Sequence, residues 1–409
     1  MENKLKKWFL GISLVLSCAV HTQQCPYEAV AIVPVADLLG QSMATITPQV
    51  TQGYEQLALC PHKGTFSCPR IHQLLFHEQV TVLEESGTEV CIRIPNLFFT
   101  TAQTQQPQTT FWTHKKNILP LDALHDARGK IPLPVRYDEK GITNTTIVTL
   151  ASPFYDTQTG ITFSAGTRFV PVKQKFTHEK EWLVYVVDPV HKKIIPIRLP
   201  RNHCVALMQK ETPAQRQALF VKILKRWTHH KKNGFIPYVW GGCSFLTTCK
   251  NSRFRTQATT LLEPTGTAYT YPDCKPPCTG FDCAGLVSRA AQLAGIPYFY
   301  KNTRTLAQFL KEIGPNQSAQ AGDLIWFPGH VMVISDVQAN AIIEARHYSH
   351  GYGKVHEIPI GKVFNNINTI TDLKRARAHK KKLQRMDSKG MVVQSIPHFK
   401  LLRMSSVWS

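Results

Sequence analysis

Short segments with alternating apolar and polar residues mark the first half of the chain. The clearest are residues 79–83, 90–94, 147–150, 168–172 and 182–187. A period of two places the apolar side chains on one face of a sheet, so each segment predicts a strand. We therefore predict two small β-rich units, over residues 26–122 and 135–207.

A helical period replaces this alternation at Thr212. Thr212 and Gln215 have the spacing of a reciprocal capping pair, and Pro213 stands at the first helical position. We expect this helix to run to about Trp227. Further elements are predicted over 306–313 and near Leu324, Val331 and Ile342. Helices and strands in this order predict an α+β domain over residues 212–372.

Cys283 opens another predicted helix. Asp282 is a residue type that favours the N-cap, and Gly295 with Pro297 supplies a stop. The helix dipole and free backbone N–H groups at a helix start stabilise a thiolate. We therefore expect the thiol pKa to lie below its usual value of roughly 8.5, and lower still beside an imidazole.

His330 is the candidate partner of Cys283, because it opens a short apolar strand at residues 331–334. A thiolate paired with an imidazolium is a nucleophile with its own proton donor. A cysteine that stood alone would more often be a buried structural residue. The combination of Cys283 and His330 favours nucleophilic catalysis.

Three motifs, in this order, resemble the NlpC/p60 family of papain-like cysteine peptidases, which cut bacterial cell-wall peptides. They are residues 237–242 (PYVWGG), Asp282-Cys283 within 280–287, and residues 321–330 (AGDLIWFPGH). The resemblance covers roughly residues 212–372. It implies a papain-like fold, catalytic roles for Cys283 and His330, and no cofactor.

The family usually carries His, Asn or Gln in the next strand, just before an alanine, to orient the imidazole. Here Glu344 precedes Ala345, and a carboxylate can accept a hydrogen bond from the ring. His347 is the rival, but strand alternation puts it on the opposite face from Glu344. We predict Glu344 as the third catalytic residue.

The resemblance also implies two substrate contacts. Asp282 would cap the helix and also meet the free amine of a stem peptide, and Tyr238 would line the cleft near Cys283. Ala284 stands where the family commonly has serine, a departure that bears on selectivity rather than on catalysis.

The β-rich units resemble bacterial SH3-type (SH3b) modules. Residues 70–78, the strands that follow and Phe111-Trp112 carry this resemblance for the first unit. The second unit is either a degenerate module or a β-subdomain without a binding role. The arrangement resembles YkfC-type peptidases, which implies cleavage between γ-D-glutamate and the diamino acid in peptidoglycan fragments with a free N-terminal L-alanine.

Three other functions remain open on this core. They are an N-acetylmuramoyl-L-alanine amidase, an acyl transferase, and an inactive protein that binds the cell wall.

The first residues predict export. Three lysines, Lys4, Lys6 and Lys7, precede an apolar stretch at 8–16 that is too short to span a bilayer. Cleavage after Ala19 would remove a signal peptide, 1–19; a lipid-anchored Cys18 is the alternative. We expect a periplasmic or envelope-associated protein.

Export would place the cysteines in an oxidising compartment. Six belong to two clusters away from Cys283, namely Cys60 and Cys68 in the first unit and Cys243, Cys249, Cys274 and Cys278 in an insertion. The four in the insertion could hold zinc, but their uneven spacing favours disulfides.

The formal net charge of +21 favours anionic partners. Many basic residues lie at 373–409, which we interpret as a solvated or frayed basic tail. The segment lacks the aromatic platforms of a nucleic-acid site, so we expect an anionic wall or membrane surface instead, beside stem peptides or muropeptides as substrates.

Overall fold

The protein is described here by a computed structural model. The described residues are 24–42, 70–95, 97–100, 107–124, 133, 147–172, 180–207, 211–228, 234–246, 279–296, 299–347 and 352–407. The predicted signal peptide 1–19 lies outside them, as do Cys18, Cys60, Cys68, Cys249, Cys274 and Cys278. Within these ranges, no helix has both the length and the apolar character needed to cross a membrane.

The first unit is a seven-stranded antiparallel sheet in the order β3-β2-β7-β5-β4-β1-β8. Its strands are β1 (Tyr27–Ala31), β2 (Val35–Leu39), β3 (Arg70–Leu75), β4 (Gln79–Ser86), β5 (Glu89–Arg93), β7 (Thr110–His114) and β8 (Ile118–Pro120). The predicted strands at 79–83 and 90–94 are confirmed as β4 and β5. In the described part of the chain the outer strands β3 and β8 do not pair, so no closed barrel forms and the SH3b assignment stays a prediction.

The second unit consists of three small sheets. They are β12-β9-β15, the hairpin β13-β14 and the hairpin β10-β11, with bounds β9 (Ile147–Leu150), β10 (Phe154–Asp156), β11 (Ile161–Phe163), β12 (Arg168–Phe169), β13 (Glu181–Asp188), β14 (Lys193–Pro200) and β15 (Cys204–Leu207). Phe76 and Leu119 of the first unit are buried in one core with Phe163 and Phe169 of the second. The two β-rich units therefore share a core instead of folding as separate modules.

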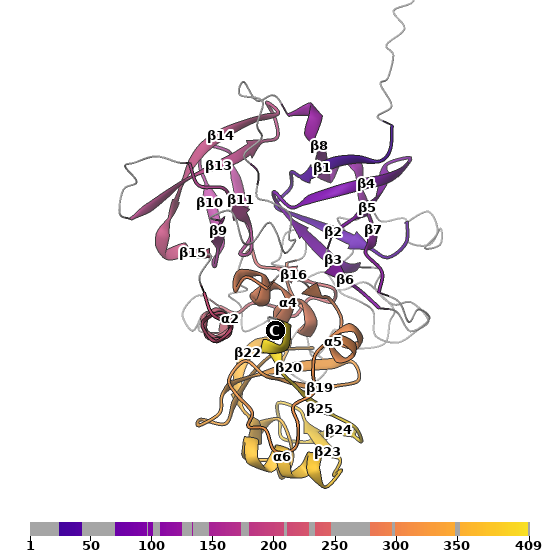
Figure 1. Cartoon of the computed structure of the whole chain (residues 1–409), viewed down its shortest axis with the longest axis vertical. Helices are drawn as coiled ribbons and strands as arrows, with labels where there is room; N and C mark the ends of the chain where they lie inside the picture. Colours follow the sequence, from indigo (N-terminus) through magenta and orange to yellow (C-terminus); the bar gives the residue numbers. More distant parts are fainter. Residues whose placement is uncertain are drawn as a thin grey trace, which may run out of the picture.

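The third unit is built on a five-stranded antiparallel sheet, β22-β21-β20-β19-β25 (Figure 1). Its strands are β19 (Leu324–Phe327), β20 (His330–Asp336), β21 (Ala341–Arg346), β22 (Lys354–Pro359) and β25 (Lys400–Leu402). One face packs against α2 (Pro213–Thr228) and α4 (Cys283–Leu293), and the other against α6 (Ile370–Ala378) and the hairpin of β23 (Leu383–Met386) and β24 (Val392–Ile396). The predicted α+β class is confirmed.

The observed ends of helix α2 agree with the prediction from the sequence, whereas those of helix α5 (Thr303–Phe309) do not. Helix α2 agrees with the prediction, and the backbone N–H of Gln215 donates to Oγ1 of Thr212 at 3.3 Å, as the capping pattern requires. Helix α5 begins and ends earlier than the predicted 306–313. The side chain of Asn302 caps it, a start signal that the apolar pattern alone did not show.

The segment from residue 373 is folded, which differs from the predicted basic tail. Strand β25 pairs with β19 in the central sheet, so the sheet extends beyond residue 372. Leu373, Leu383 and Leu401 are buried in the core beneath this sheet, whereas lysines 380–382 are exposed. The segment folds by burying apolar residues that are widely spaced in the sequence. The basic residues between them hid this apolar pattern from the sequence analysis.

Candidate active site

The start of α4 places Cys283 against the central sheet. Asp282 caps the helix as predicted, because its carboxylate accepts a hydrogen bond from the backbone N–H of Gly285. The backbone N–H groups of Ala284 and Val331 donate to the Cys283 sulfur. Val331 directly follows His330 in β20, so the thiol lies beside the strand start that carries the predicted histidine.

Glycines allow this close approach. A Cβ on Gly285 would lie 2.0 Å from the carbonyl oxygen of Gly242, and one on Gly242 would lie 2.5 Å from that of Gly280. Gly241 has φ +67°, and a Cβ there would lie 2.4 Å from the Arg70 carbonyl oxygen. The predicted tight turn at Gly241-Gly242 therefore needs glycine for both backbone conformation and space.

The Cys283 thiol is buried and protonated in this arrangement. Cys283 is 7% exposed. Burial, followed by the negative charge of Asp282, raises the pKa of the thiol to about 12, while the N–H groups of Val331 and Ala284 and the Lys301 ammonium lower it less. The expectation of a lowered thiol pKa is therefore wrong for this arrangement, because desolvation outweighs the favourable helix start.

The imidazole of His330 contacts Glu344. His330 Nε2 lies 2.7 Å from Oε2 of Glu344, which stands on the neighbouring strand β21 and is fully buried. The ring of His347, the rival candidate, instead lies 5.1 Å from the ring of Tyr238 in an edge-on contact. The structure therefore brings Glu344, and not His347, to His330.

The thiol and the imidazole belong to different faces of the sheet. Within the described ranges, no hydrogen bond joins Cys283 Sγ to the His330 ring. Met332, on the same strand face as His330, packs in the core towards α6, whereas Cys283 belongs to the core around α2 and α4. Hydrogen bonds between catalytic groups are often incomplete before substrate binds. A direct thiol-to-imidazole contact therefore requires a change in side-chain rotamer.

Two residues that the sequence did not single out also form hydrogen bonds with Glu344. Arg385 in β23 donates through Nη2 to Oε2 of Glu344 at 2.5 Å, and the same nitrogen lies 3.0 Å from His330 Nε2. His356 in β22 has its Nε2 3.2 Å from Oε1 of Glu344. Arg385 lay within the predicted basic tail; the signal that could have found it is the alternation that buries Leu383 and Arg385 but not Gln384.

The charges of this cluster fix the resting protonation of His330. Burial, then the positive charge of Arg385, lowers the pKa of His330 to about 4, although Glu344 opposes this. Burial acts to raise the pKa of Glu344, but Arg385, His330 and His356 together hold it well below its usual range. We therefore assign a neutral imidazole that donates Nε2–H to an ionised Glu344, leaving Nδ1 without a proton.

Asp282 also forms an ion pair with a buried lysine, Lys301. Nζ of Lys301 lies 3.2 Å from Oδ1 and 3.0 Å from Oδ2 of Asp282, and Lys301 is only 2% exposed. The backbone N–H of Lys301 donates to the carbonyl oxygen of Phe98, just after β6 (Leu97–Phe98) pairs with β18 (Phe299–Tyr300). The first unit thus anchors the residue that balances the charge of Asp282.

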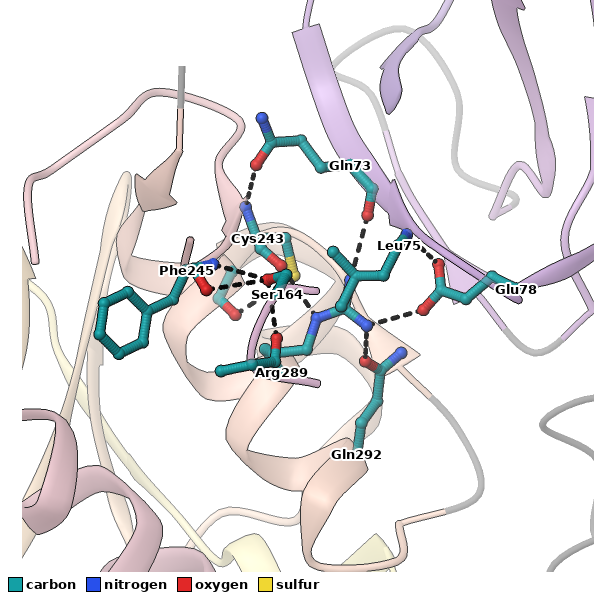
Figure 2. A network of polar contacts seen from close by, with 10 residues as sticks. Gln73, Leu75, Glu78, Ser164, Cys243, Phe245, Arg289 and Gln292 are labelled. Carbon is teal, nitrogen blue, oxygen red and sulfur yellow. Dashed lines mark hydrogen bonds and ion pairs between the residues drawn. The ribbon is translucent and has the colours of Figure 1, made fainter. Parts of the chain in front are cut away.

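Arg289, which follows Cys283 on α4, joins this helix to the first unit (Figure 2). Its guanidinium donates to the carbonyl oxygens of Cys243 at 2.9 Å and Gln73 at 3.1 Å, and to Oε1 of Glu78 at 2.7 Å. It also contacts Oε1 of Gln292. These contacts tie the helix that carries Cys283 to Gln73 and Glu78 of the first unit and to Cys243.

Cys243 carries a free, buried thiol, with its sulfur 3.5 Å from the carbonyl oxygen of Gly285. Cys243 forms no disulfide with another described residue, and a disulfide or zinc site in the insertion stays a prediction. Its three predicted partners in the insertion lie outside the described residues. Among the residues that the structure covers, no cluster of three metal-ligating side chains is found.

No protein-family model matches the chain. No curated protein matches it either.

Solved structures give several likenesses. An NlpC/P60 family protein from Bacillus cereus is 15% identical with a TM-score of 0.49, over 81% of this chain and 94% of the other. NlpC2 from Trichomonas vaginalis is 11% identical with a TM-score of 0.30, over 83% and 94%. The peptidoglycan hydrolase RipB from Mycobacterium tuberculosis is 22% identical with a TM-score of 0.24, over 37% and 62%. Each likeness is distant, so the function proposed below rests on this chain's own residues.

Proposed function

We propose that the chain is a cysteine endopeptidase that hydrolyses peptidoglycan stem peptides. The observation that supports this best is the buried contact between the neutral His330 imidazole, at the strand start beside the Cys283 thiol, and the ionised Glu344 on the neighbouring strand. A base with a fixed tautomer next to a thiol at a helix start has the parts needed for acyl transfer. The motifs around both residues supply the substrate class.

The reaction begins with a neutral Cys283 thiol and a neutral His330 imidazole. As Cys283 Sγ attacks the amide carbonyl carbon, its proton passes to Nδ1 of His330, which Glu344 leaves free by accepting Nε2–H. The developing oxyanion accepts a hydrogen bond from the Cys283 backbone N–H, which lies in the first helical turn and has no acceptor within the helix. His330 then returns the proton to the leaving amine, and the C–N bond breaks.

Water completes the cycle. His330, neutral again, takes a proton from water as the oxygen attacks the thioester carbonyl. The C–S bond breaks, the acid product leaves, and Cys283 recovers its proton. Because the thiol is buried and neutral at rest, proton transfer and attack have to be concerted, after a side-chain rotamer change that brings the thiol to Nδ1 of His330 while Nε2 keeps its contact with Glu344.

For specificity, we propose cleavage between γ-D-glutamate and the diamino acid in fragments with a free N-terminal L-alanine. Asp282 is the proposed contact for the amine, and Tyr238, which is 4% exposed, is the proposed second substrate contact. Because Lys301 already balances the charge of Asp282, we expect the preference for a free over a blocked amine to be modest.

We also propose that the protein acts in the cell envelope. The signal-like residues 1–19 support export, with Cys18 as a possible lipid anchor. The exposed lysines 380–382 and Arg375, on the side of the sheet away from α4, would favour an anionic wall polymer or lipid. An increase in salt would weaken such binding.

Product identity tests the proposal. The chain from residue 20 is incubated with L-Ala-γ-D-Glu-diaminopimelate peptides whose N-termini are free or acetylated, and with the matching N-acetylmuramoyl peptides. Mass spectrometry then identifies the products. Release of L-Ala-γ-D-Glu supports the endopeptidase; release of the whole peptide from muramic acid would instead show an amidase, and exchange onto an added amine without hydrolysis would show a transferase.

A further inference from the structure

Glu344, the third proposed catalytic residue, carries a full negative charge. This charge disfavours the neutral form of His330, which is the form that can act as a base. A buried carboxylate in contact with an imidazole stabilises imidazolium, and an imidazolium cannot accept the proton of a neutral thiol. Glu344 alone would therefore favour the inactive protonation state of His330.

Arg385 lies where it can offset that charge. Its Nη2, Oε2 of Glu344 and Nε2 of His330 form a triangle with sides of 2.5, 2.7 and 3.0 Å. Arginine can only donate and an ionised carboxylate can only accept, so Oε2 accepts from both nitrogens. The Arg385 side chain is 5% exposed, which leaves its charge poorly screened.

We propose that Arg385 is a positioning residue that fixes Glu344 in line with Nε2 of His330 and offsets its charge, so that the imidazole rests as a neutral base. The inference rests on the proposed function for its catalytic consequence. Glu344 and Arg385 then act as a unit, equivalent in net charge to one neutral hydrogen-bond acceptor.

Other charged or titratable groups surround His330 and enter the same balance. Arg346 on β21 has Nη1 3.7 Å from Oε1 of Glu344, and His356 on β22 contacts the same oxygen. The Cys283 thiol on α4 is neutral. Arg346 lies at the greater distance and its other nitrogen donates to the carbonyl oxygen of Met386, so Arg385 is the main cation at Nε2.

The charge balance predicts that removing both partners does less harm than removing one. In Arg385→Gln the amide can still reach Glu344, but the carboxylate keeps only the more distant Arg346 as a cation, and imidazolium is favoured. In Glu344→Gln the arginine is left as an uncompensated buried cation. In the double variant both charges are gone, and a neutral acceptor again faces Nε2.

The test is a titration of His330 in full-length protein labelled at histidine ¹³Cε1, with His330→Gln used to assign the signal. In the unsubstituted protein we expect a midpoint at about 4. Arg385→Gln should raise this midpoint by about 1 pH unit or more. Arg385→Lys, which keeps the charge, should stay near the unsubstituted value, and so should the double variant. Arg375→Met removes an exposed arginine and serves as the matched control.

Two outcomes would overturn the proposal. One is a His330 midpoint that moves no further in Arg385→Gln than in Arg375→Met. The other applies where the unsubstituted protein hydrolyses the peptide, and is a double variant that is then no more active than Glu344→Gln. If the midpoints move as expected while no variant cleaves a stem peptide, the role of Arg385 stands and the proposed function fails.

Discussion

Replacing Arg289 with methionine should destabilise the protein strongly. The guanidinium is fully buried and donates to two backbone carbonyl oxygens and to Glu78, whose side chain is 11% exposed. Methionine can fill the volume of the arginine stem, but it donates no hydrogen bond. The change therefore isolates the polar contacts shown in Figure 2.

The expected loss follows from the groups left behind. Breaking a buried ion pair by removing one partner costs about 3–5 kcal/mol. The carbonyl oxygens of Gln73 and Cys243 also lose a charged donor. Each buried acceptor that is left without a partner lowers the free energy of unfolding by about 1–3 kcal/mol. Part of this loss overlaps, so we expect the free energy of unfolding to fall by about 4 kcal/mol.

Urea unfolding followed by tryptophan fluorescence measures this loss. The matched control is Arg198→Met, which removes an exposed arginine with Nη1 3.2 Å from Oε2 of Glu181. Such a surface pair contributes less than about 1 kcal/mol. If Arg289→Met unfolds at the same urea concentration as Arg198→Met, the network does not hold α4 to the first unit and the reasoning is refuted.

Three further predictions concern packing, specificity and acid stability. Gly285→Ala should abolish hydrolysis and lower the melting temperature, because its Cβ would lie 2.0 Å from a backbone oxygen, whereas Gly314→Ala meets only atoms at 3.5 Å or more and should behave normally. Lys301→Met should increase the ratio of kcat/KM for free over acetylated peptides, since it leaves Asp282 uncompensated; an unchanged ratio would exclude Asp282 as the amine contact. Burial lowers the pKa of His77 to about 3, although a hydrogen bond to the Arg168 carbonyl oxygen opposes this. As the pH falls below about 6.5, the His77 side chain therefore binds a proton in the unfolded state but not in the folded state. Stability should then fall by about 1.4 kcal/mol per pH unit down to about pH 3 for this group, and His77→Gln should remove that slope from the urea-unfolding data.

Local signals were sufficient for the elements that carry the predicted catalytic residues. The cap at Asp282, the apolar strand after His330 and the alternation at Glu344 each depend on neighbours in sequence, and the structure has α4, β20 and β21 at those places. The choice of Glu344 over His347 needed only the period of a strand. Their catalytic roles remain the proposal tested below.

Contacts between distant segments could not be predicted in the same way. Arg385 contacts Glu344 from 41 residues away, and Lys301, which contacts Asp282, stands next to the pairing of β6 with β18. The thiol pKa depended mainly on burial, and the core around Cys283 is built from α2, α4 and strands of the central sheet. The buried apolar residues of the C-terminal segment were too widely spaced among lysines and arginines to stand out as a pattern.

The most direct test of the central claim compares Cys283→Ala with the unsubstituted protein on the free-amine stem peptide. Cys91→Ala, which removes another free thiol in the first unit, is the matched control. We expect Cys283→Ala to release no L-Ala-γ-D-Glu, while Cys91→Ala releases it at the normal rate. Release of the same product by Cys283→Ala at a comparable rate would show that Cys283 is not the nucleophile.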